Sequence, residues 1–166
     1  HTHAAPRGPG KFADRARAGG VDGVILPDVP LEESAPASIA LAAVGIDLIQ
    51  LASPASDAER LARLVKATRG FLYVVSSFGV TGARAELAPE TAELVQRVRA
   101  ACGATVPFAV GFGVSRPDHV QRCAHEGARG LGVGSAIVAP TEQGGAPPPI
   151  APFADIRARY ASRAPP

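Results

Sequence analysis

Three short segments combine glycine with a hydroxyl or aromatic residue, and each follows a predicted strand. They are residues 78–83 (FGVTGA), 111–115 (GFGVS) and 134–135 (GS). Glycine lets the backbone approach a ligand closely, and free amide groups at a helix start attract anions. Gly113 and Gly134 lie 21 residues apart on successive units, as a phosphate cradle shared by neighbouring loops requires. Together the segments predict phosphate binding, although each alone also suits a plain turn, a core aromatic residue or a helix cap.

Titratable side chains give less support to catalysis. Asp28 is the one carboxylate that directly follows a predicted strand, and an Asx-type turn between Pro27 and Pro30 is the simpler interpretation. General acid–base catalysis usually needs two positioned groups, and no convincing pair occurs. The glutamates are interpreted as helix-start or solvated charges, and no metal site is predicted. We interpret the four histidines as solvated and the two cysteines as core residues: His1, His3, His119, His125, Cys102 and Cys123.

Composition and charge exclude several classes of protein. The chain has 166 residues, of which 46% are hydrophobic and 19% are charged, as expected for one globular domain. The net charge is only +2, and basic residues are interspersed with acidic ones, so neither nucleic acid nor a membrane surface is a predicted partner. No apolar stretch approaches the roughly 20 residues that span a bilayer. With only two cysteines, a reducing, cytoplasmic compartment is expected.

Short apolar runs alternate with segments of helical periodicity, a pattern typical of parallel βα units. Glu59 lies three residues after Ser56, which predicts a capping box there, and Ser115 is a predicted cap. The pitch suits both an eightfold barrel and a doubly wound sheet, and glycines at the strand ends favour the barrel. The predicted strands are residues 23–26, 46–51, 71–75, 107–112 and 130–133, and the predicted helices include residues 34–44, a helix beginning at Pro89, one ending at Gly127, and residues 153–162.

Four segments of the chain resemble the tryptophan synthase alpha subunit, in family order and with family spacing. They are residues 20–33, residues 73–76 together with 79–83, residues 109–115 and residues 133–138. The resemblance implies an incomplete (β/α)8 TIM barrel, comprising about the last five βα units. It covers residues 12–166, and residues 1–11 are expected to be a disordered start outside it.

The resemblance also implies an activity and a partner. Family members cleave indole-3-glycerol phosphate to indole and glyceraldehyde 3-phosphate, and indole passes to a beta subunit that carries pyridoxal phosphate in an alpha2beta2 tetramer. The alpha chain itself is expected to hold no cofactor. Matching by motif implies four groups of residues: a phosphate cradle of Gly82, Gly113, Gly134 and Ser135; indole-pocket walls Tyr73 and Phe112; the loop-closure hydroxyl of Thr81; and a loop facing the beta subunit with Asp28 and Pro30.

The family's catalytic glutamate and aspartate follow its second and third strands, in a segment resembling Pro-Phe-Ser-Asp-Pro. No such segment occurs in this sequence, so no catalytic residue is assigned, and we expect a fragment that does not cleave the substrate alone. Two other functions stay open. One is a non-catalytic module that binds phosphate and docks on a beta subunit. The other is a different phosphate-binding barrel enzyme, such as a sugar-phosphate isomerase, which would share Gly113 and Gly134 but not residues 79–82.

Overall fold

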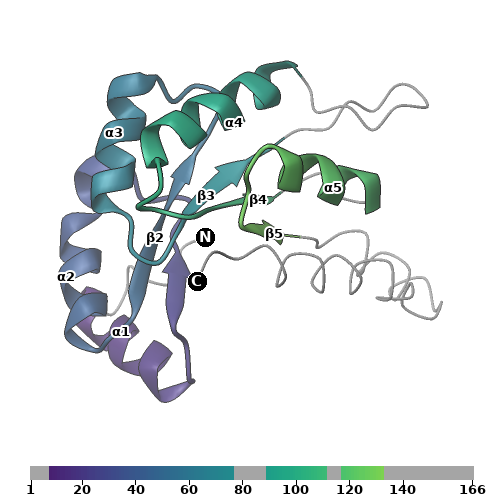
Figure 1. Cartoon of the computed structure of the whole chain (residues 1–166). Helices are drawn as coiled ribbons and strands as arrows, with labels where there is room; N and C mark the ends of the chain where they lie inside the picture. Colours follow the sequence, from purple (N-terminus) through teal and green to yellow (C-terminus); the bar gives the residue numbers. More distant parts are fainter. Residues whose placement is uncertain (1–7, 77–88, 112–116, 133–166) are drawn as a thin grey trace.

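The computed structural model describes residues 8–76, 89–111 and 117–132, and within them all five predicted strands are confirmed (Figure 1). The strands are β1 (Gly23–Ile25), β2 (Asp47–Ala52), β3 (Leu72–Val75), β4 (Phe108–Gly111) and β5 (Gly130–Gly132). The helices are α1 (Gly8–Ala18), the 3-10 turn η2 (Leu31–Glu33), α2 (Ala35–Ala43), α3 (Ala58–Ala67), α4 (Pro89–Cys102) and α5 (Pro117–His125). The cap predicted at Ser115 and the helix predicted at residues 153–162 lie outside the described residues.

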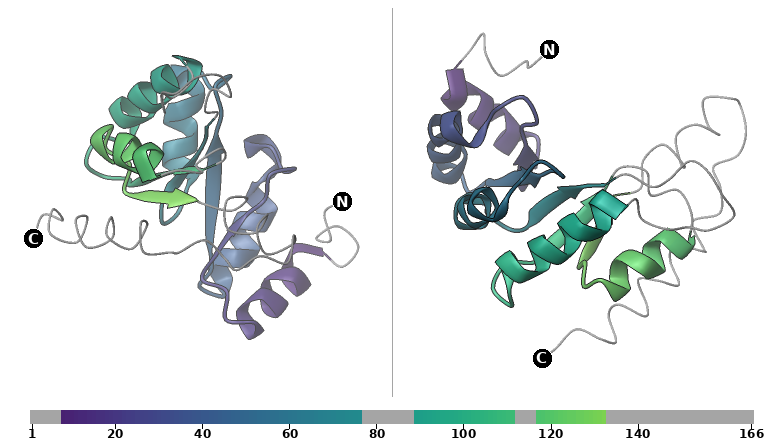
Figure 2. Two further views of the ribbon diagram at one scale, coloured as in Figure 1. Left: turned by 90° about the vertical axis from the view of Figure 1, so that its right-hand side faces the viewer. Right: turned by 90° about the horizontal axis from the view of Figure 1, so that it is seen from above.

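The strands form one parallel sheet in which spatial order follows chain order, β1-β2-β3-β4-β5. A doubly wound sheet would reverse its strand order at a switch point and carry helices on both faces. Here α2, α3, α4 and α5 lie along the outer side of a curled sheet (Figures 1 and 2). This arrangement is that of a partial (β/α) barrel, and it decides between the two architectures that the periodicity left open.

Successive side chains along each strand point alternately to the outer face of the sheet, which the helices cover, and to its inner face. Leu72 and Val74 of β3 are fully buried against the helices, whereas Tyr73 and Val75 point to the inner face and are only partly buried. The outer residues belong to one hydrophobic core, which we call the main core: Ala52, Leu61, Leu64, Leu72, Val74, Leu94, Val95, Val98, Cys102, Phe108, Val110, Cys123 and Ala128.

A second, smaller core lies at the β1 end of the sheet. It consists of Ala13, Leu41, Ile46 and Leu48, and Phe12 packs against it. The structure therefore corrects the start that was expected to be disordered through residue 11. Helix α1 begins at Gly8 and crosses the predicted boundary, because Phe12, Ala13 and Ala16 lie at helical spacing and pack on this core.

Helix α3 begins one residue later than the capping box predicted. Asp57 is its N-cap, and the carboxylate accepts a hydrogen bond of 2.7 Å from the Arg60 amide. The Ser56 hydroxyl instead accepts from the Ser53 amide at 3.1 Å and stabilises the preceding turn. The prediction of a Ser56–Glu59 box is thus wrong, because Asp57 offers a carboxylate next to the same orphan amides.

The described helices are short. The longest, α4, has 14 residues, against the roughly 20 that a membrane-spanning helix needs. None of the helices in the described part of the chain could cross a membrane.

Candidate functional site

The carboxyl ends of β3, β4 and β5 lie side by side at one edge of the sheet. Their register pairs Val75 with Gly111 and Gly111 with Gly132. Each of these strands leads into one of the segments that predicted phosphate binding. The residues named for that role, together with the loop hydroxyl and the second pocket wall, lie outside the described residues: Thr81, Gly82, Phe112, Gly113, Gly134 and Ser135. The structure therefore aligns the strands that precede these segments, as a shared cradle requires.

Ser76 fixes the end of β3 against β4. Its amide and its hydroxyl both donate to the carbonyl oxygen of Gly111, at 2.8 and 2.7 Å. Its side chain is buried, so these bonds form away from solvent. Sequence reasoning gave Ser76 no role, although a hydroxyl directly after an apolar strand is a usable signal for such a link. This link fixes the last described residue after β3 against the end of β4.

Tyr73 lies on the inner face of the sheet, across two glycines of neighbouring strands. A Cβ placed on Gly111 would lie 1.7 Å from the Tyr73 hydroxyl oxygen, and one on Gly132 would lie 3.0 Å from it. Partial burial raises the pKa of the Tyr73 phenol. The sequence suggested that Gly111 lets the backbone approach a ligand closely; in the described residues the space beside Gly111 is taken by the Tyr73 ring. Its role as a wall of an indole pocket stays a prediction.

The loop after β1 carries Asp28 and Pro30, and both are exposed. A turn is present, as expected, but the Val29 amide closes it by donating to the Leu26 carbonyl at 3.2 Å. An Asx turn from Asp28 would need an amide hydrogen two residues later, and Pro30 has none. The Asx-type interpretation is therefore corrected to a backbone-closed turn that leaves the Asp28 carboxylate at the surface.

Glu32 joins this loop to α3. Its carboxylate oxygen Oε1 accepts hydrogen bonds from Arg60 and, at 2.9 Å, from Nη2 of Arg63. The hydrogen bond from Arg60 holds the pKa of the Glu32 carboxyl below its ordinary range, and the positive charges of both arginines act in the same direction. The sequence suggested a helix-start or solvated charge, and Glu32 is exposed in the first turn of η2; the structure adds its bridge to α3.

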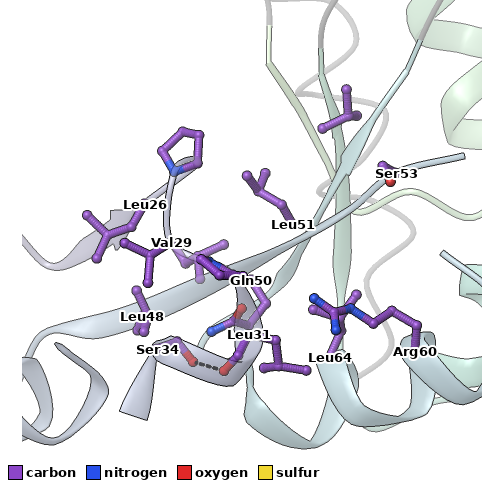
Figure 3. A pocket seen from close by; sticks show the side chains of 14 residues that line it. Leu26, Val29, Leu31, Ser34, Leu48, Gln50, Leu51, Ser53, Arg60 and Leu64 are labelled. Atoms are coloured by element: carbon purple, nitrogen blue, oxygen red, sulfur yellow. Dashed lines mark hydrogen bonds between the residues drawn. The ribbon is translucent and has the colours of Figure 1, made fainter. Parts of the chain in front are cut away.

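A cavity of about 260 Å³ lies beneath the same loop (Figure 3). Leu26 and Val29 come from the loop, Leu51 from the end of β2, and Arg60 and Leu64 from α3. The sequence did not identify this cavity, because its walls come from four separate parts of the chain: the loop, β2, α3 and Val75 of β3. Most of its lining is apolar: Leu26, Pro27, Val29, Pro30, Leu31, Ser34, Leu48, Ile49, Gln50, Leu51, Ser53, Arg60, Leu64 and Val75.

In helix α5 the structure corrects the prediction for one histidine. His119 is only 6% exposed, although the sequence assigned it to the polar side of the helix. It lies one turn before Cys123, so the two share the stripe that packs on the main core. His125 is exposed, as predicted. Cys102 and Cys123 are buried and free, as predicted, and burial raises the pKa of the Cys123 thiol to about 11.

Comparison with known proteins decides the family. A sequence profile described as the tryptophan synthase alpha chain matches residues 4–149. The chain belongs to the tryptophan synthase alpha chain family. Membership confirms the resemblance that the motifs carried, and it removes the alternative of an unrelated phosphate-binding barrel enzyme.

Individual alpha chains match at substantial identity. The tryptophan synthase alpha chain of Methanoregula boonei is 45% identical over 132 residues, which cover 80% of this chain and 49% of that protein. That of Prochlorococcus marinus is 43% identical over 132 residues, covering 80% and 47%. A solved structure of the tryptophan synthase a2b2 complex from Pyrococcus furiosus matches with a TM-score of 0.79 and 36% identity, covering 86% of this chain and 57% of the matched chain.

These matches also show how much of an alpha chain is represented in this sequence. The chain spans about half the length of the curated relatives it matches. The match to the chain from the Pyrococcus furiosus complex confirms the incomplete barrel of five parallel strands. The family profile begins at residue 4, ahead of the start at residue 12 that the motifs indicated.

Proposed function

We propose that this chain forms the phosphate-binding and partner-facing part of a tryptophan synthase alpha chain. In that role it serves the cleavage of indole-3-glycerol phosphate to indole and glyceraldehyde 3-phosphate, in complex with a beta subunit as alpha2beta2. The observation that carries the proposal is the alignment of the β3, β4 and β5 ends, within a family match over residues 4–149.

Under this proposal the phosphate group binds where β3, β4 and β5 end. Gly82, Gly113 and Gly134 would donate backbone amides, and Ser135 would add its hydroxyl. The support is that Val75, Gly111 and Gly132 are neighbours in register, so the three following segments start from adjacent points. Tyr73, at the same edge, would contact the indole ring from below, with Phe112 as the second wall.

The proposed reaction needs groups that this chain does not supply. The chain offers positioning: a phosphate cradle, a ring wall at Tyr73, and the hydroxyl of Thr81 on a closing loop. The acid–base pair that the family uses belongs to a segment with no counterpart in these 166 residues. We therefore expect the chain by itself to bind the phosphate ligand weakly, without cofactor, and to release no indole.

The non-catalytic alternative predicts the same binding with a different outcome. A docking module would alter beta-subunit activity without chemistry of its own. The observation that favours it is the loop with Asp28 and Pro30, which is exposed and held by Glu32 against α3. The reducing cytoplasm is the proposed location for either function, since both cysteines are free thiols.

Indole release and ligand binding test the proposal together. The 166-residue chain is incubated with indole-3-glycerol phosphate, and indole is measured by fluorescence; binding of inorganic phosphate is followed by NMR. We expect no indole, and phosphate binding that Ser135→Ala weakens by about 10- to 100-fold, corresponding to one hydrogen bond to a charged group. Ser38→Ala, on helix α2, is the matched control and should leave binding unchanged.

Two outcomes would contradict the proposal. Measurable indole from the chain alone would show that it carries its own catalytic groups. Absence of both phosphate binding and beta-subunit binding would remove the alpha-chain function. The intact mass of the native protein separates the remaining alternatives: about 10 kDa above 16.9 kDa indicates roughly three more βα units, and a mass of 16.9 kDa favours the docking module.

A further inference from the structure

The loop between β1 and α2 is anchored from two directions. It comprises residues 26–34, and its exposed tip carries Asp28 and Pro30. From below, Leu31 is partly buried and packs against the main core. From the side, Glu32 accepts hydrogen bonds from two arginines of α3.

Hydrogen bonds within the loop are local: the Val29 amide donates to the Leu26 carbonyl, and the Ser34 hydroxyl donates to the Leu31 carbonyl at 2.7 Å. The two anchors are therefore what join the loop to the rest of the described chain.

The ion pairs are well placed to act as a clamp. Arg60 and Arg63 lie three residues apart on α3, so both side chains leave the same face of the helix. They converge on a single oxygen of Glu32, a residue 28 and 31 positions away in sequence. Arg60 also lines the cavity beneath the loop. Releasing Glu32 would therefore remove the polar link between the loop and α3 beside this cavity and leave the apolar contact of Leu31.

We propose that Glu32, through Arg60 and Arg63, is a positioning residue that presents Asp28 and Pro30 to the beta subunit and so sets the affinity of the complex. This inference rests on the proposed function, in which the loop faces that partner. A loop that is held in its bound conformation loses less freedom on docking, and this saving appears as tighter binding. Glu32 itself need not touch the partner.

Two neighbouring carboxylates allow a matched comparison. Glu32→Gln keeps the size of the side chain and removes its charge. Glu33→Gln makes the same change one residue later, at an exposed side chain that joins neither of the two ion pairs with α3. A triple variant, Glu32→Arg with Arg60→Glu and Arg63→Glu, restores attraction with the charges reversed. All of these substitutions are at surface side chains, so the variants should fold as the unaltered chain does.

The first readout is amide hydrogen exchange of the chain without any partner. The amides that close the loop are those of Val29, Glu33 and Ser34, which donate to Leu26, Pro30 and Leu31. In Glu32→Gln we expect these amides to exchange about 3- to 10-fold faster. The Thr68 amide, at the far end of α3, should keep its rate. Glu33→Gln should resemble the unaltered chain, and the triple variant should recover most of the protection.

The second readout is the affinity for a purified tryptophan synthase beta subunit, measured by calorimetry. We expect binding about 3- to 10-fold weaker for Glu32→Gln, unchanged for Glu33→Gln, and largely restored for the triple variant. High salt should reduce the difference in affinity between the unaltered chain and Glu32→Gln, because salt screens these exposed charges.

Each outcome decides the inference. If exchange in Glu32→Gln equals that in Glu33→Gln, the clamp does not exist and the inference is overturned, whatever the affinity. If amide exchange in Glu32→Gln rises but its affinity for the beta subunit is unchanged, the position of the loop does not set binding, and the inference is again overturned. If the unaltered chain does not bind the beta subunit while exchange behaves as expected, the proposed partner is wrong, and the claim about affinity falls with it.

Discussion

Tyr73 shows how one side chain sets the residue types around it. Its ring crosses from β3 over β4 and β5, and the space it occupies at Gly111 is the space that a Cβ would need. A glycine at Gly111 is therefore required by packing, and backbone conformation does not demand it. The same contact places a phenol, partly withdrawn from water, at the edge where phosphate and indole are proposed to bind.

Gly111→Ala tests this contact directly. The added methyl group would lie 1.7 Å from the Tyr73 hydroxyl oxygen, so Tyr73 or the strand must shift. We expect a loss of about 1–3 kcal/mol in the free energy of unfolding, as found for overpacked cores. Urea unfolding followed by circular dichroism measures it.

Two further variants make the result specific. Gly10→Ala, in helix α1 with open space around the added Cβ, should stabilise the chain by about 0.5–1 kcal/mol. In a Tyr73→Leu background the cost of Gly111→Ala should fall, because the clashing ring is gone. An unchanged cost in that background would show that the strain comes from elsewhere.

Helix α3 does two tasks at the scale of an element. Leu61 and Leu64 are buried and hold the helix on the sheet, while the partly exposed Arg60 and Arg63 flank that buried face and hold the loop after β1. The three-residue spacing of both pairs puts each on one side of the helix. The strong amphipathic pattern was visible in the sequence. The use of its polar side was not, because Glu32 lies about thirty residues earlier in the chain.

The start of α3 provides a test at this scale. Asp57→Ala should lower the free energy of unfolding by about 1 kcal/mol, because the Arg60 amide loses its acceptor. Glu59→Ala should change it by less than about 0.5 kcal/mol, as at an ordinary surface site. Denaturant titration of both variants gives the answer. A larger loss for Glu59→Ala would support the capping box that the sequence suggested.

At the scale of the whole molecule, the two cores are unequal. The main core joins β2 to β5 with α3, α4 and α5, whereas the smaller core joins α1, α2 and β2. Strand β1 has only three residues, and it lies at one edge of the described sheet. The β1 end is therefore held by less buried apolar surface, which is the main source of stability.

Native-state hydrogen exchange should reveal this difference. We expect the amides of β3, in the middle of the sheet, to exchange only through global unfolding. Amides of β1 should exchange at least 10-fold faster, through local opening of α1, β1 and α2. Equal protection of β1 and β3 would mean that the two cores unfold as one unit. Leu41→Ala, in the smaller core, is a second test. If the two cores unfold separately, this variant should increase the difference in exchange rate between the β1 and β3 amides; if they unfold as one unit, the difference should not change.

The sequence by itself determined the elements and the family. Short apolar runs and stripes of helical period depend on neighbouring residues, so the five strands and their intervening helices could be placed within one or two residues. The tryptophan synthase alpha family was identified from the motifs in residues 20–33, 73–76 with 79–83, 109–115 and 133–138, and the profile over residues 4–149 confirms it.

Only the tertiary structure decided which residues meet. Glu32 with Arg60, Tyr73 with Gly111, and Ser76 with the Gly111 carbonyl all join segments about thirty residues or more apart. Such contacts depend on strand order and register, and no local pattern encodes these. For the same reason the burial of His119 and the cavity beneath the β1–α2 loop emerged only once the chain was folded. The barrel had been implied by the family resemblance, and the strand order confirms it where periodicity alone left a doubly wound sheet open.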